Sequence, residues 1–500
     1  MEKTGGPDMV NDNLARYNTE SVKSETIIND SSLKWCTVSL SDVISRGIRL
    51  EASVFDIEAK QARQLIANGK YKPKTLCGPG GFASAYTCGR FKRIWVEKSE
   101  YPIYQPSAIV DIKPVPDGYI SRLTKTDIEA LRVHKGQILM TCSGTVGKLS
   151  YVSKTLDNQI FSHDLLRITC NNPLDAGYIY TYLKSAIGNK ILLTNNYGAV
   201  ITHIEADHLD TVPIPNAPKE LKKRISDLIE QSYALRDESN ELIDEATKLM
   251  VDELKLPSIH EFKKIDTQVN TFSVKLSDIS GRLDASYHVP IVEAIKGHLK
   301  KYAEEVTTIG DKRVSKKIIL AGVFKRTYVS EDYGYPFLGG KEITQLSPDI
   351  EKFLSKLIHK TRYEKELKVE ENMILVTDRG SIGIVSMVPR HWNGYAVSQN
   401  VLKVVPANDS IAGYIYIFLN SDWGNVLIRR QTYGSVVDMI NDHSLSEVGF
   451  PLLKNHEIQK QINDLALAAN EKRYEAYKLE QEALRIMNDE VIYAHCNSTR

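Results

Sequence analysis

Two stretches of the sequence carry small or apolar residues at alternating intervals of four and three positions. One runs from residue 221 to 249 and the other from 458 to 486, and neither contains glycine or proline. A mean repeat of 3.5 residues is typical of a coiled-coil seam. The pattern therefore predicts two long helices, with seams at Leu221, Ile225, Leu228, Ser232, Leu235, Ser239, Leu242, Ala246 and Leu249, and at Ile458, Ile462, Leu465, Ala469, Lys472, Ala476, Leu479, Ala483 and Ile486.

A seam of this kind needs a partner, because an isolated helix would leave its apolar stripe in water. We expect the two helices to pair with each other as an antiparallel coiled coil, which would bring Leu235 near Lys472. The alternative is that each seam binds a helix of another subunit.

The sequence also contains an internal repeat. Residues 138–147 (ILMTCSGTVG) match residues 374–383 (ILVTDRGSIG), and residues 176–183 (AGYIYTYL) match residues 412–419 (AGYIYIFL), both at an offset of 236. The same offset relates Tyr197-Gly198 to Tyr433-Gly434 and Leu40-Ser41-Asp42 to Leu276-Ser277-Asp278. So many ordered matches indicate a duplication.

Within the repeat, apolar runs predict buried strands at Ile138-Leu139 and Ile374-Leu375. The glycines that follow them predict turns, and the AGYIY segments predict short amphipathic helices. We therefore predict an α+β protein with two repeated mixed α/β domains. The predicted ranges are a disordered polar tail (1–32), a first domain (33–217), a long helix (218–255), a linker (256–272), a second domain (273–455) and a second long helix (456–492).

The composition excludes several classes of protein. No run of about 18 apolar residues predicts a membrane span, and the N-terminus lacks the pattern of a signal peptide, so we expect a cytoplasmic protein. The cysteine and histidine spacings match no metal site, so we expect no bound metal. A net charge of +1 argues against a protein that coats nucleic acid without selectivity.

Positive charge is nevertheless concentrated at related places in the two copies. Residues 70–98 contain seven basic residues and one acidic residue, and residues 312–328 contain six basic residues and no acidic residue. Lysine and arginine clusters of this kind are expected where a protein contacts DNA phosphates or guanine edges. The alternative is a solvated basic surface. The predicted DNA-binding residues are Lys72, Lys74, Arg90, Lys92, Arg93, Lys316, Lys317, Lys325 and Arg326.

The matched hairpins supply a second, weaker set of candidates. Lys148 in the first copy and Arg379 in the second follow the same strand, but the polar residues around them differ between the copies. Divergence on a shared scaffold is what two domains that read different DNA sequences would need. Neutral drift would produce the same difference.

Two absences bear on catalysis. The sequence contains no G-x-x-x-x-G-K-[ST] nucleotide-binding loop, and it lacks the N/D-P-P-Y/F tetrapeptide typical of amino-methyltransferases. We therefore expect a non-catalytic chain that binds no cofactor itself.

Taken together, the doubled order of motifs resembles the DNA-specificity subunits of type I restriction–modification systems over about residues 33–490. The features that carry the resemblance are the Leu-Ser-Asp start, the Arg-Leu-Asp/Glu-Ala segment, the Ile-Leu-x-Thr-x-x-Gly-x-x-Gly hairpin and the proline-bearing exit into a long helix. The resemblance implies two target-recognition domains that read the halves of an asymmetric bipartite DNA site. It also implies two methyltransferase subunits that use S-adenosylmethionine, and restriction subunits that use ATP and Mg²⁺.

Three alternatives stay open at this point. Related subunits serve other phage-defence complexes that do not use restriction in the strict sense. A coiled-coil scaffold whose domains bind proteins would show no DNA sequence preference. An autonomous modification enzyme would transfer methyl groups without a partner, which the missing tetrapeptide disfavours.

Overall fold

A computed structural model describes residues 28–29, 34–35, 37–45, 50, 52–194, 202–262, 271–279, 281–434 and 436–494. Most of the predicted polar tail, residues 263–270 of the predicted linker, and Tyr197-Gly198 lie outside these described residues. Within residues 1–32, the structure describes only β1 (Ile28–Asn29), which pairs with β2 (Lys34–Trp35). None of the helices in the described part of the chain is long and apolar enough to cross a membrane.

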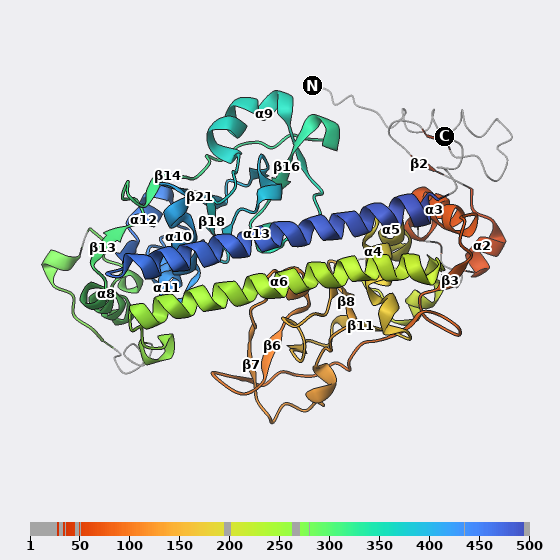
Figure 1. The fold of residues 1–500 in the computed structure, drawn as a ribbon, viewed down its shortest axis with the longest axis horizontal. Helices are drawn as coiled ribbons and strands as arrows, with labels where there is room; N and C mark the ends of the chain where they lie inside the picture. The colour runs from red at the N-terminus through yellow and green to blue at the C-terminus, as the bar shows by residue number, and fades with distance from the viewer. Residues whose placement is uncertain are drawn as a thin grey trace, which may run out of the picture.

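Two long helices, α6 (Lys219–Glu253) and α13 (His456–Ile486), lie side by side along the molecule (Figure 1). A turn of π-helix, Met487–Ile492, continues α13. The rise of about 1.5 Å per residue makes α6 roughly 50 Å long. Asn455 caps α13 by accepting hydrogen bonds from the backbone N–H groups of Glu457 and Ile458.

The contacts between the two helices run in opposite directions along the chain, so the predicted antiparallel pairing is confirmed. Arg224 pairs with Glu490, with an N–O distance of 3.0 Å. Farther along α6, Ser232 donates to the carbonyl of Ala476 at 2.7 Å. Beyond it, Glu238 pairs with Lys472. Lys472 therefore lies beside Glu238, about one helical turn from Leu235.

Burial divides each predicted seam into two unequal lines. The small residues and three isoleucines are buried: Ile225, Ser232, Ser239, Ala246, Ile462, Ala469, Ala476, Ala483 and Ile486. Apart from Ile486, the alternate positions are only half-buried: Leu221, Leu228, Leu235, Leu242, Leu249, Ile458, Leu465, Lys472 and Leu479. A further buried line on α6 includes Ile229, Tyr233 and Ile243. The buried face is rotated away from the predicted seam because each helix packs against its own domain as well as against the other helix.

Besides the β1–β2 pair, the described residues of the first copy form three sheets. The largest is antiparallel, in the order β4 (Ala83–Tyr86), β11 (Leu165–Cys170), β8 (Ile138–Thr141) and β9 (Leu149–Tyr151). The second is mixed, in the order β10 (Ile160–Phe161), β6 (Pro102–Tyr104), β7 (Gly118–Ile120) and β5 (Trp95–Val96). A third pairs β12 (Pro213–Pro215), which leads into α6, with β3 (Pro73–Thr75).

The second copy repeats this topology sheet by sheet. Its antiparallel sheet has the order β14 (Ser315–Ile319), β21 (Val401–Pro406), β18 (Ile374–Thr377) and β19 (Val385–Met387). Its mixed sheet contains β15 (Tyr328–Val329), β17 (Phe353–Ser355), β16 (Gly334–Leu338) and β20 (Ala396–Val397). The pair β13 (Glu305–Thr308) and β22 (Gly449–Leu452) leads into α13.

Short helices complete each copy. The first has α2 (Leu40–Ser45), α3 (Ile57–Ala67), α4 (Ala176–Lys184) and α5 (Ala186–Leu193). The second has α8 (Pro290–Tyr302), α9 (Lys356–Arg362), α10 (Asp409–Asn420), α11 (Asp422–Arg430) and α12 (Asp442–Ser446). The predicted strands and turns are confirmed, since Ile138 and Ile374 are fully buried and Gly144 and Gly380 both have φ of +71°. The prediction that the AGYIY helices are amphipathic was wrong, because α4 and α10 are buried almost all round.

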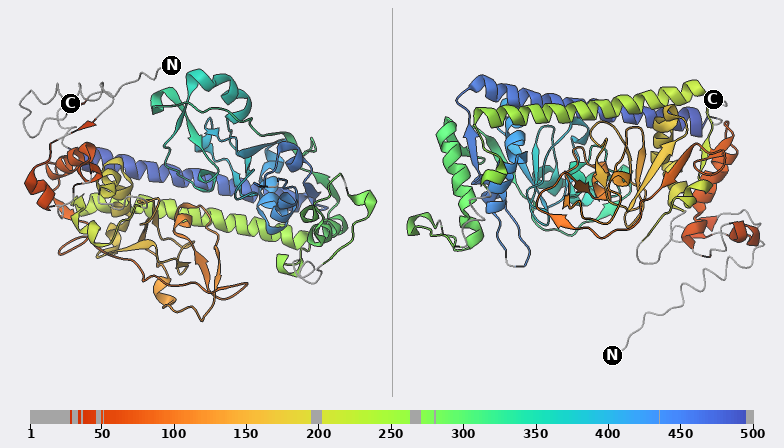
Figure 2. Two further views of the ribbon diagram at one scale, coloured as in Figure 1. Left: turned by 180° about the vertical axis from the view of Figure 1, so that it is seen from behind. Right: turned by 90° about the horizontal axis from the view of Figure 1, so that it is seen from below.

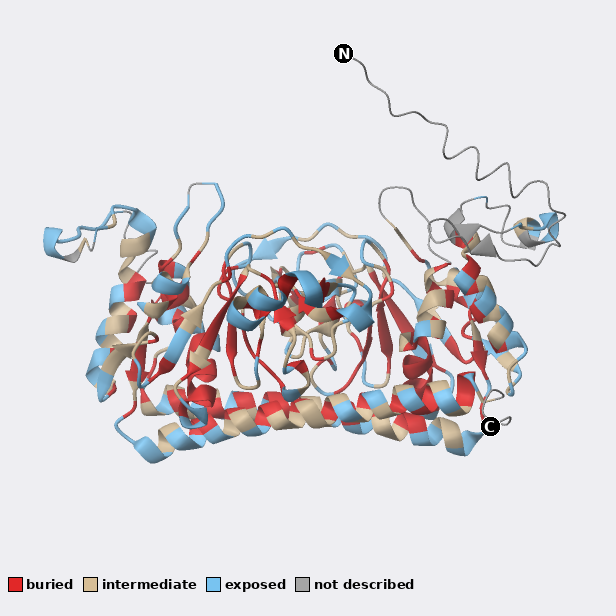
Figure 3. Ribbon diagram, turned by 90° about the horizontal axis from the view of Figure 1, so that it is seen from above, coloured by how far each residue is buried: buried red, intermediate tan, exposed pale blue. Residues whose placement is uncertain are grey.

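Neither domain core is closed without both long helices. The core of the first copy includes Ile225 and Ile229 of α6 as well as Ala483 and Ile486 of α13. The two copies lie on opposite sides of the helix pair (Figure 1) and both stand on one face of it (Figure 2). Figure 3 shows their near-symmetric arrangement above the helices, whose other face is left uncovered by either domain.

Candidate nucleic-acid interface

The predicted DNA-binding arginines Arg93 and Arg326 occupy equivalent places in the two copies. Arg93 donates to the Oγ of Ser162 at 2.7 Å, and Arg326 donates to the Oγ of Ser398 at 3.4 Å. The Arg93 guanidinium lies 5.9 Å from the ring centre of Trp95, and the Arg326 guanidinium lies 5.3 Å from the ring centre of Phe337. Each ring belongs to the mixed sheet of the same copy. Both arginines are half-buried, so part of their donor capacity already holds the domain together.

The neighbouring cations are more accessible. Arg90 and Lys92 are exposed in the segment between β4 and β5, and Lys325 is exposed in the corresponding segment before β15. Within the described part of the chain, none of these three residues forms an ion pair. Their charge is therefore available to an anionic ligand.

Lys72 and Lys74 lie elsewhere in the first copy. Both are exposed on or beside β3, in the small sheet that leads into α6. The backbone carbonyl of Lys72 accepts from the N–H of Asn216, and the Lys74 ammonium lies 5.9 Å from the ring centre of Phe82. The sequence cluster 70–98 is thus divided between two sheets.

The basic cluster of the second copy is also altered by the fold. Lys316 and Lys317 are exposed on the edge strand β14. Arg313, although absent from the predicted set, belongs to the same cluster and pairs with Asp311 at 2.6 Å and with Glu305 at 2.7 Å. Hydrogen bonds from Arg313 hold the pKa of the Asp311 carboxyl far below its ordinary range. Residues 312–328 contain no acidic residue, but Glu305 and Asp311, which precede them, neutralise the charge of Arg313.

The weaker candidates of the matched hairpins are both paired with acids. Lys148 forms an ion pair with Asp349 of the other copy, with an N–O distance of 2.6 Å. Arg379 pairs with the buried Asp378 beside it at 2.9 Å. The hairpin backbones are the same, since Thr141 and Thr377 each donate to the carbonyl four residues later at 2.5 Å. Both cations therefore have a structural partner in addition to any DNA contact.

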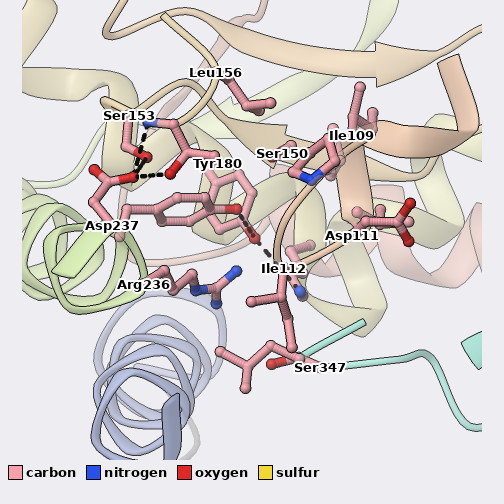
Figure 4. Close-up of a pocket in the computed structure, with 17 residues that line it drawn as sticks. Ile109, Asp111, Ile112, Ser150, Ser153, Leu156, Tyr180, Arg236, Asp237 and Ser347 are labelled. Carbon is pink, nitrogen blue, oxygen red and sulfur yellow. Dashed lines mark hydrogen bonds between the residues drawn. The ribbon is translucent and has the colours of Figure 1, made fainter. Parts of the chain in front are cut away.

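The two copies also touch each other directly, which the sequence pattern did not indicate. The backbone N–H of Ile112 donates to the carbonyl of Thr344 at 2.9 Å, and the Thr344 hydroxyl donates to Asp111. Beside this contact lies a cavity of about 50 Å³, shown in Figure 4, whose wall includes Tyr180, Arg236 and Ser347. A buried carboxylate, Glu480, lies against the same three residues.

Each domain is attached to its own helix by different chemistry. Asp237 of α6 accepts hydrogen bonds from the hydroxyls of Ser153 and Thr155, at 2.9 Å and 2.6 Å (Figure 4 labels Asp237 and Ser153). In the second copy, the ring of His391 stacks on Tyr477 of α13, with centroids 3.9 Å apart. The scaffold is duplicated, but its attachment points have diverged.

The described residues offer cations rather than reactive groups. No three histidine, cysteine or acidic side chains in the described ranges are grouped so that they could hold a metal ion. Cys77, Cys88, Cys142 and Cys170 are free thiols, and burial raises the pKa of Cys77 and Cys170 to about 12. The exposed lysines and arginines can bind an anion such as a phosphate backbone.

Comparison with known proteins identifies a family. Residues 91–248 and 315–465 match the model of the type I restriction modification DNA specificity domain, one match in each copy. No curated protein matches the chain. Among solved structures, the chain is similar to the S subunit of a type I restriction-modification system from M. genitalium, at 14% identity and a TM-score of 0.32, over 85% of this chain and 96% of that one. It is also similar to the HsdS subunit from Thermoanaerobacter tengcongensis, at 15% identity and a TM-score of 0.26, over 85% and 99% of the two chains.

Proposed function

This chain belongs to the type I restriction–modification DNA specificity family, and from that membership we propose that it reads an asymmetric bipartite DNA site for partner enzymes. Residues 33–217 and 273–455 would each recognise one half of the site. Specificity subunits are the non-catalytic components of their complexes, so the chemistry belongs to other chains.

One observation supports the bipartite reading most directly. Two domains of the same topology are fixed on one face of an antiparallel helix pair, and their equivalent surface residues differ. Ser143 of the first copy corresponds to Arg379 of the second, on hairpins with the same backbone geometry. A shared frame with different side chains is suited to two different half-sites at a fixed distance.

Among the predicted residues, the exposed cations without an acidic partner in the described part of the chain are the best candidates for phosphate contact. They are Lys72, Lys74, Arg90, Lys92, Lys316, Lys317 and Lys325. Phosphate contacts position a protein on DNA, and base contacts provide specificity. Arg93, Arg326, Lys148 and Arg379 already bond to protein groups, so we assign them a secondary role in DNA binding.

The uncovered face of the helix pair supports docking of partner subunits. The proposed partners are two methyltransferase subunits, which would carry S-adenosylmethionine, and restriction subunits, which would carry ATP and Mg²⁺. The approximate twofold arrangement of the chain in Figure 3 suits two copies of one methyltransferase.

A domain exchange tests this function. Residues 33–217 are replaced with the first recognition domain of another specificity subunit, and the methylated sites in the genome are mapped before and after the exchange. We expect one half of the modified motif to change while the other half persists.

The reciprocal exchange of residues 273–455 is the control and should change only the other half. Methylated motifs that do not change in either exchange would contradict the proposal. A coiled-coil scaffold that binds only proteins would in addition show little loss of DNA binding as salt is raised, whereas a DNA reader loses affinity steeply.

A further inference from the structure

A carboxylate on α13 joins four parts of the molecule. Glu480 is fully buried and accepts a hydrogen bond from the Tyr180 hydroxyl of the first domain at 2.7 Å. It also pairs with Lys184 of α4 at 3.1 Å and with Arg236 of α6 at 3.0 Å. Ser347 of the second domain donates to its other oxygen at 2.7 Å. Figure 4 labels Tyr180, Arg236 and Ser347 at the neighbouring cavity.

Glu480 remains ionised in this environment. Burial alone would raise its pKa, but the nearby Lys184 and Arg236 hold the pKa of Glu480 far below its ordinary range. A buried ion pair of this kind contributes little to net stability, yet removal of one partner leaves an uncompensated charge. Such pairs are therefore suited to selecting one arrangement among several.

The small residues of the helix interface discriminate weakly between registers. The buried small residues recur every seven positions, as Ser232, Ser239 and Ala246 on α6 and as Ala469, Ala476 and Ala483 on α13. If α6 slipped by seven residues along α13, small residues would again face small residues. The small residues of the seam, taken by themselves, would therefore tolerate the slip.

The ion pair of Arg236 and Glu480 does not tolerate a slip of seven residues. A slip of seven residues in one direction would place Arg236 opposite Arg473 and Glu480 opposite Ile229. In the other direction, Arg236 would face Met487 and Glu480 would face Ile243. Each slip leaves buried charges unpaired, and one of them also brings two arginines together, which is strongly unfavourable.

The second half of the molecule has no equivalent of this pair. Arg473 corresponds to Arg236, but the position that corresponds to Glu480 is occupied by Ile243. Arg473 instead donates to the Oγ of Ser239 at 3.4 Å and lies near the ring of Tyr416. The off-centre pair of Arg236 and Glu480 is therefore a feature of the buried interface that differs between registers.

We propose that the Arg236–Glu480 pair, with Tyr180, Lys184 and Ser347, sets the register of the two helices and thereby the spacer between the two DNA half-sites. This inference rests on the proposed bipartite function. A slip of seven residues moves one domain past the other by about 10 Å. That distance corresponds to roughly three base pairs of B-DNA. Glu480 is thus a positioning residue for spacer specificity.

The test is methylation by the reconstituted complex of this chain with its methyltransferase subunits. The substrates are duplexes with both half-sites constant and spacers from three base pairs shorter to three longer than the natural length. We expect wild type to select one spacer. We expect Glu480→Gln to reduce that preference at least tenfold through added activity at the spacers three base pairs away, with unchanged half-site sequences. Glu238→Gln, which removes the exposed pair with Lys472 in the same interface, is the matched control and should keep the wild-type profile.

The outcomes separate this inference from the proposed function. If folded Glu480→Gln has a lower melting temperature but the wild-type spacer profile, its role is merely structural and the inference is overturned. If Glu480→Gln fails to fold, Lys184→Gln is the second variant, because Lys184 is half-buried and pairs with the same carboxylate. An unchanged spacer profile for Lys184→Gln would also overturn the inference. A wild-type complex that methylates half-sites at every spacer overturns the bipartite function itself, and this inference with it.

Discussion

Arg167 and Lys403 occupy the same position in the two copies, and both are cations with no exposed surface. Arg167 on β11 is opposite Leu139, and Lys403 on β21 is opposite Leu375. The Arg167 guanidinium donates to the carbonyls of Leu165, Leu131 and Phe161, at distances of 2.9 to 3.2 Å. Among the described residues, Lys403 donates only to the carbonyl of Val401, at 3.4 Å. The duplication has kept a buried positive charge in both cores but satisfies it well in only one.

Replacement of Lys403 by methionine should therefore stabilise the protein near neutral pH. Burial lowers the pKa of Lys403 from 10.5 to about 8, with an opposing effect from Glu366. Below pH 8, the ammonium is charged in both the folded and unfolded states, so the full desolvation penalty, about 3 kcal/mol, is present. We expect Lys403→Met to have the higher free energy of unfolding at pH 7, measured by urea denaturation.

The pH dependence distinguishes this cause from better packing. Between pH 8 and 10.5, the unfolded wild type binds more protons than the folded protein, so wild-type stability rises with pH relative to the variant. The advantage of Lys403→Met should accordingly shrink across that window. A constant advantage would show that the charge is not responsible.

His391 should make the attachment of the second domain sensitive to acid. Burial lowers the pKa of His391 from 6.5 to about 4; Arg236 also lowers it, while the hydrogen bond to the Leu346 carbonyl and Glu480 raise it. Because the folded pKa is depressed, this contribution to stability is present above pH 6.5 and is lost as pH falls towards 4. We expect the urea midpoint of wild type to fall in this range.

His391→Phe is the matching variant because phenylalanine can keep the stacking on Tyr477 but cannot titrate. Its urea midpoint should fall less steeply than that of wild type between pH 6.5 and 4. Parallel curves for the two proteins would contradict the assignment of this pH dependence to His391.

Two glycines allow the domains to approach the long helices. A Cβ atom on Gly177 would lie 2.7 Å from the Cα of Ser226 of α6, and one on Gly413 would lie 2.3 Å from the carbonyl oxygen of Asn463 of α13. Neither backbone atom can yield easily, so we expect Gly177→Ala and Gly413→Ala each to destabilise the protein by about 1–3 kcal/mol. Thermal unfolding measures the effect.

Gly297→Ala is the control for these glycine variants. Gly297 is exposed within α8, and an added Cβ would meet nothing within 4 Å. Alanine in an exposed helix interior should stabilise it by up to about 1 kcal/mol. A loss of stability in Gly177→Ala and Gly413→Ala together with a gain in Gly297→Ala would show that the close approach of the helices, rather than helix propensity, determines the change in stability.

The exposed cations of the first domain should determine the salt dependence of DNA binding. Each phosphate contact contributes about 0.9 to the slope of log affinity against log salt concentration. If Arg90 and Lys92 both contact phosphates, the double variant Arg90→Gln/Lys92→Gln should reduce the magnitude of that slope by about 1.8 and weaken binding to all sequences. Fluorescence anisotropy over a salt series is the measurement.

Arg313→Gln is the matched control for DNA binding, since Arg313 is equally basic in sequence but is neutralised by Glu305 and Asp311. It should leave the slope unchanged. A slope unchanged by Arg90→Gln/Lys92→Gln would remove these two residues from the interface.

The sequence by itself determined the duplication, the two long helices and the family. These features depend on local periodicity and on ordered matches between the copies, which are visible without contacts. The heptad spacing predicted the antiparallel pair, and the glycine positions predicted the hairpin turns. The sequence also indicated Arg90, Lys92 and Lys325 as candidate DNA contacts; all three are exposed in the structure, and their contact with DNA stays a prediction.

Only the tertiary structure decided which charges have partners and which face of each helix is buried. Lys148 is paired with Asp349 of the other copy, which no local pattern reports. Arg313 is paired with Asp311 and Glu305, which precede the basic window, and only the folded chain shows that both carboxylates contact its guanidinium. Glu480 is the clearest case. In sequence it is one more acid on a charged helix, and only the folding of two domains and two helices around it makes it a buried carboxylate at their junction.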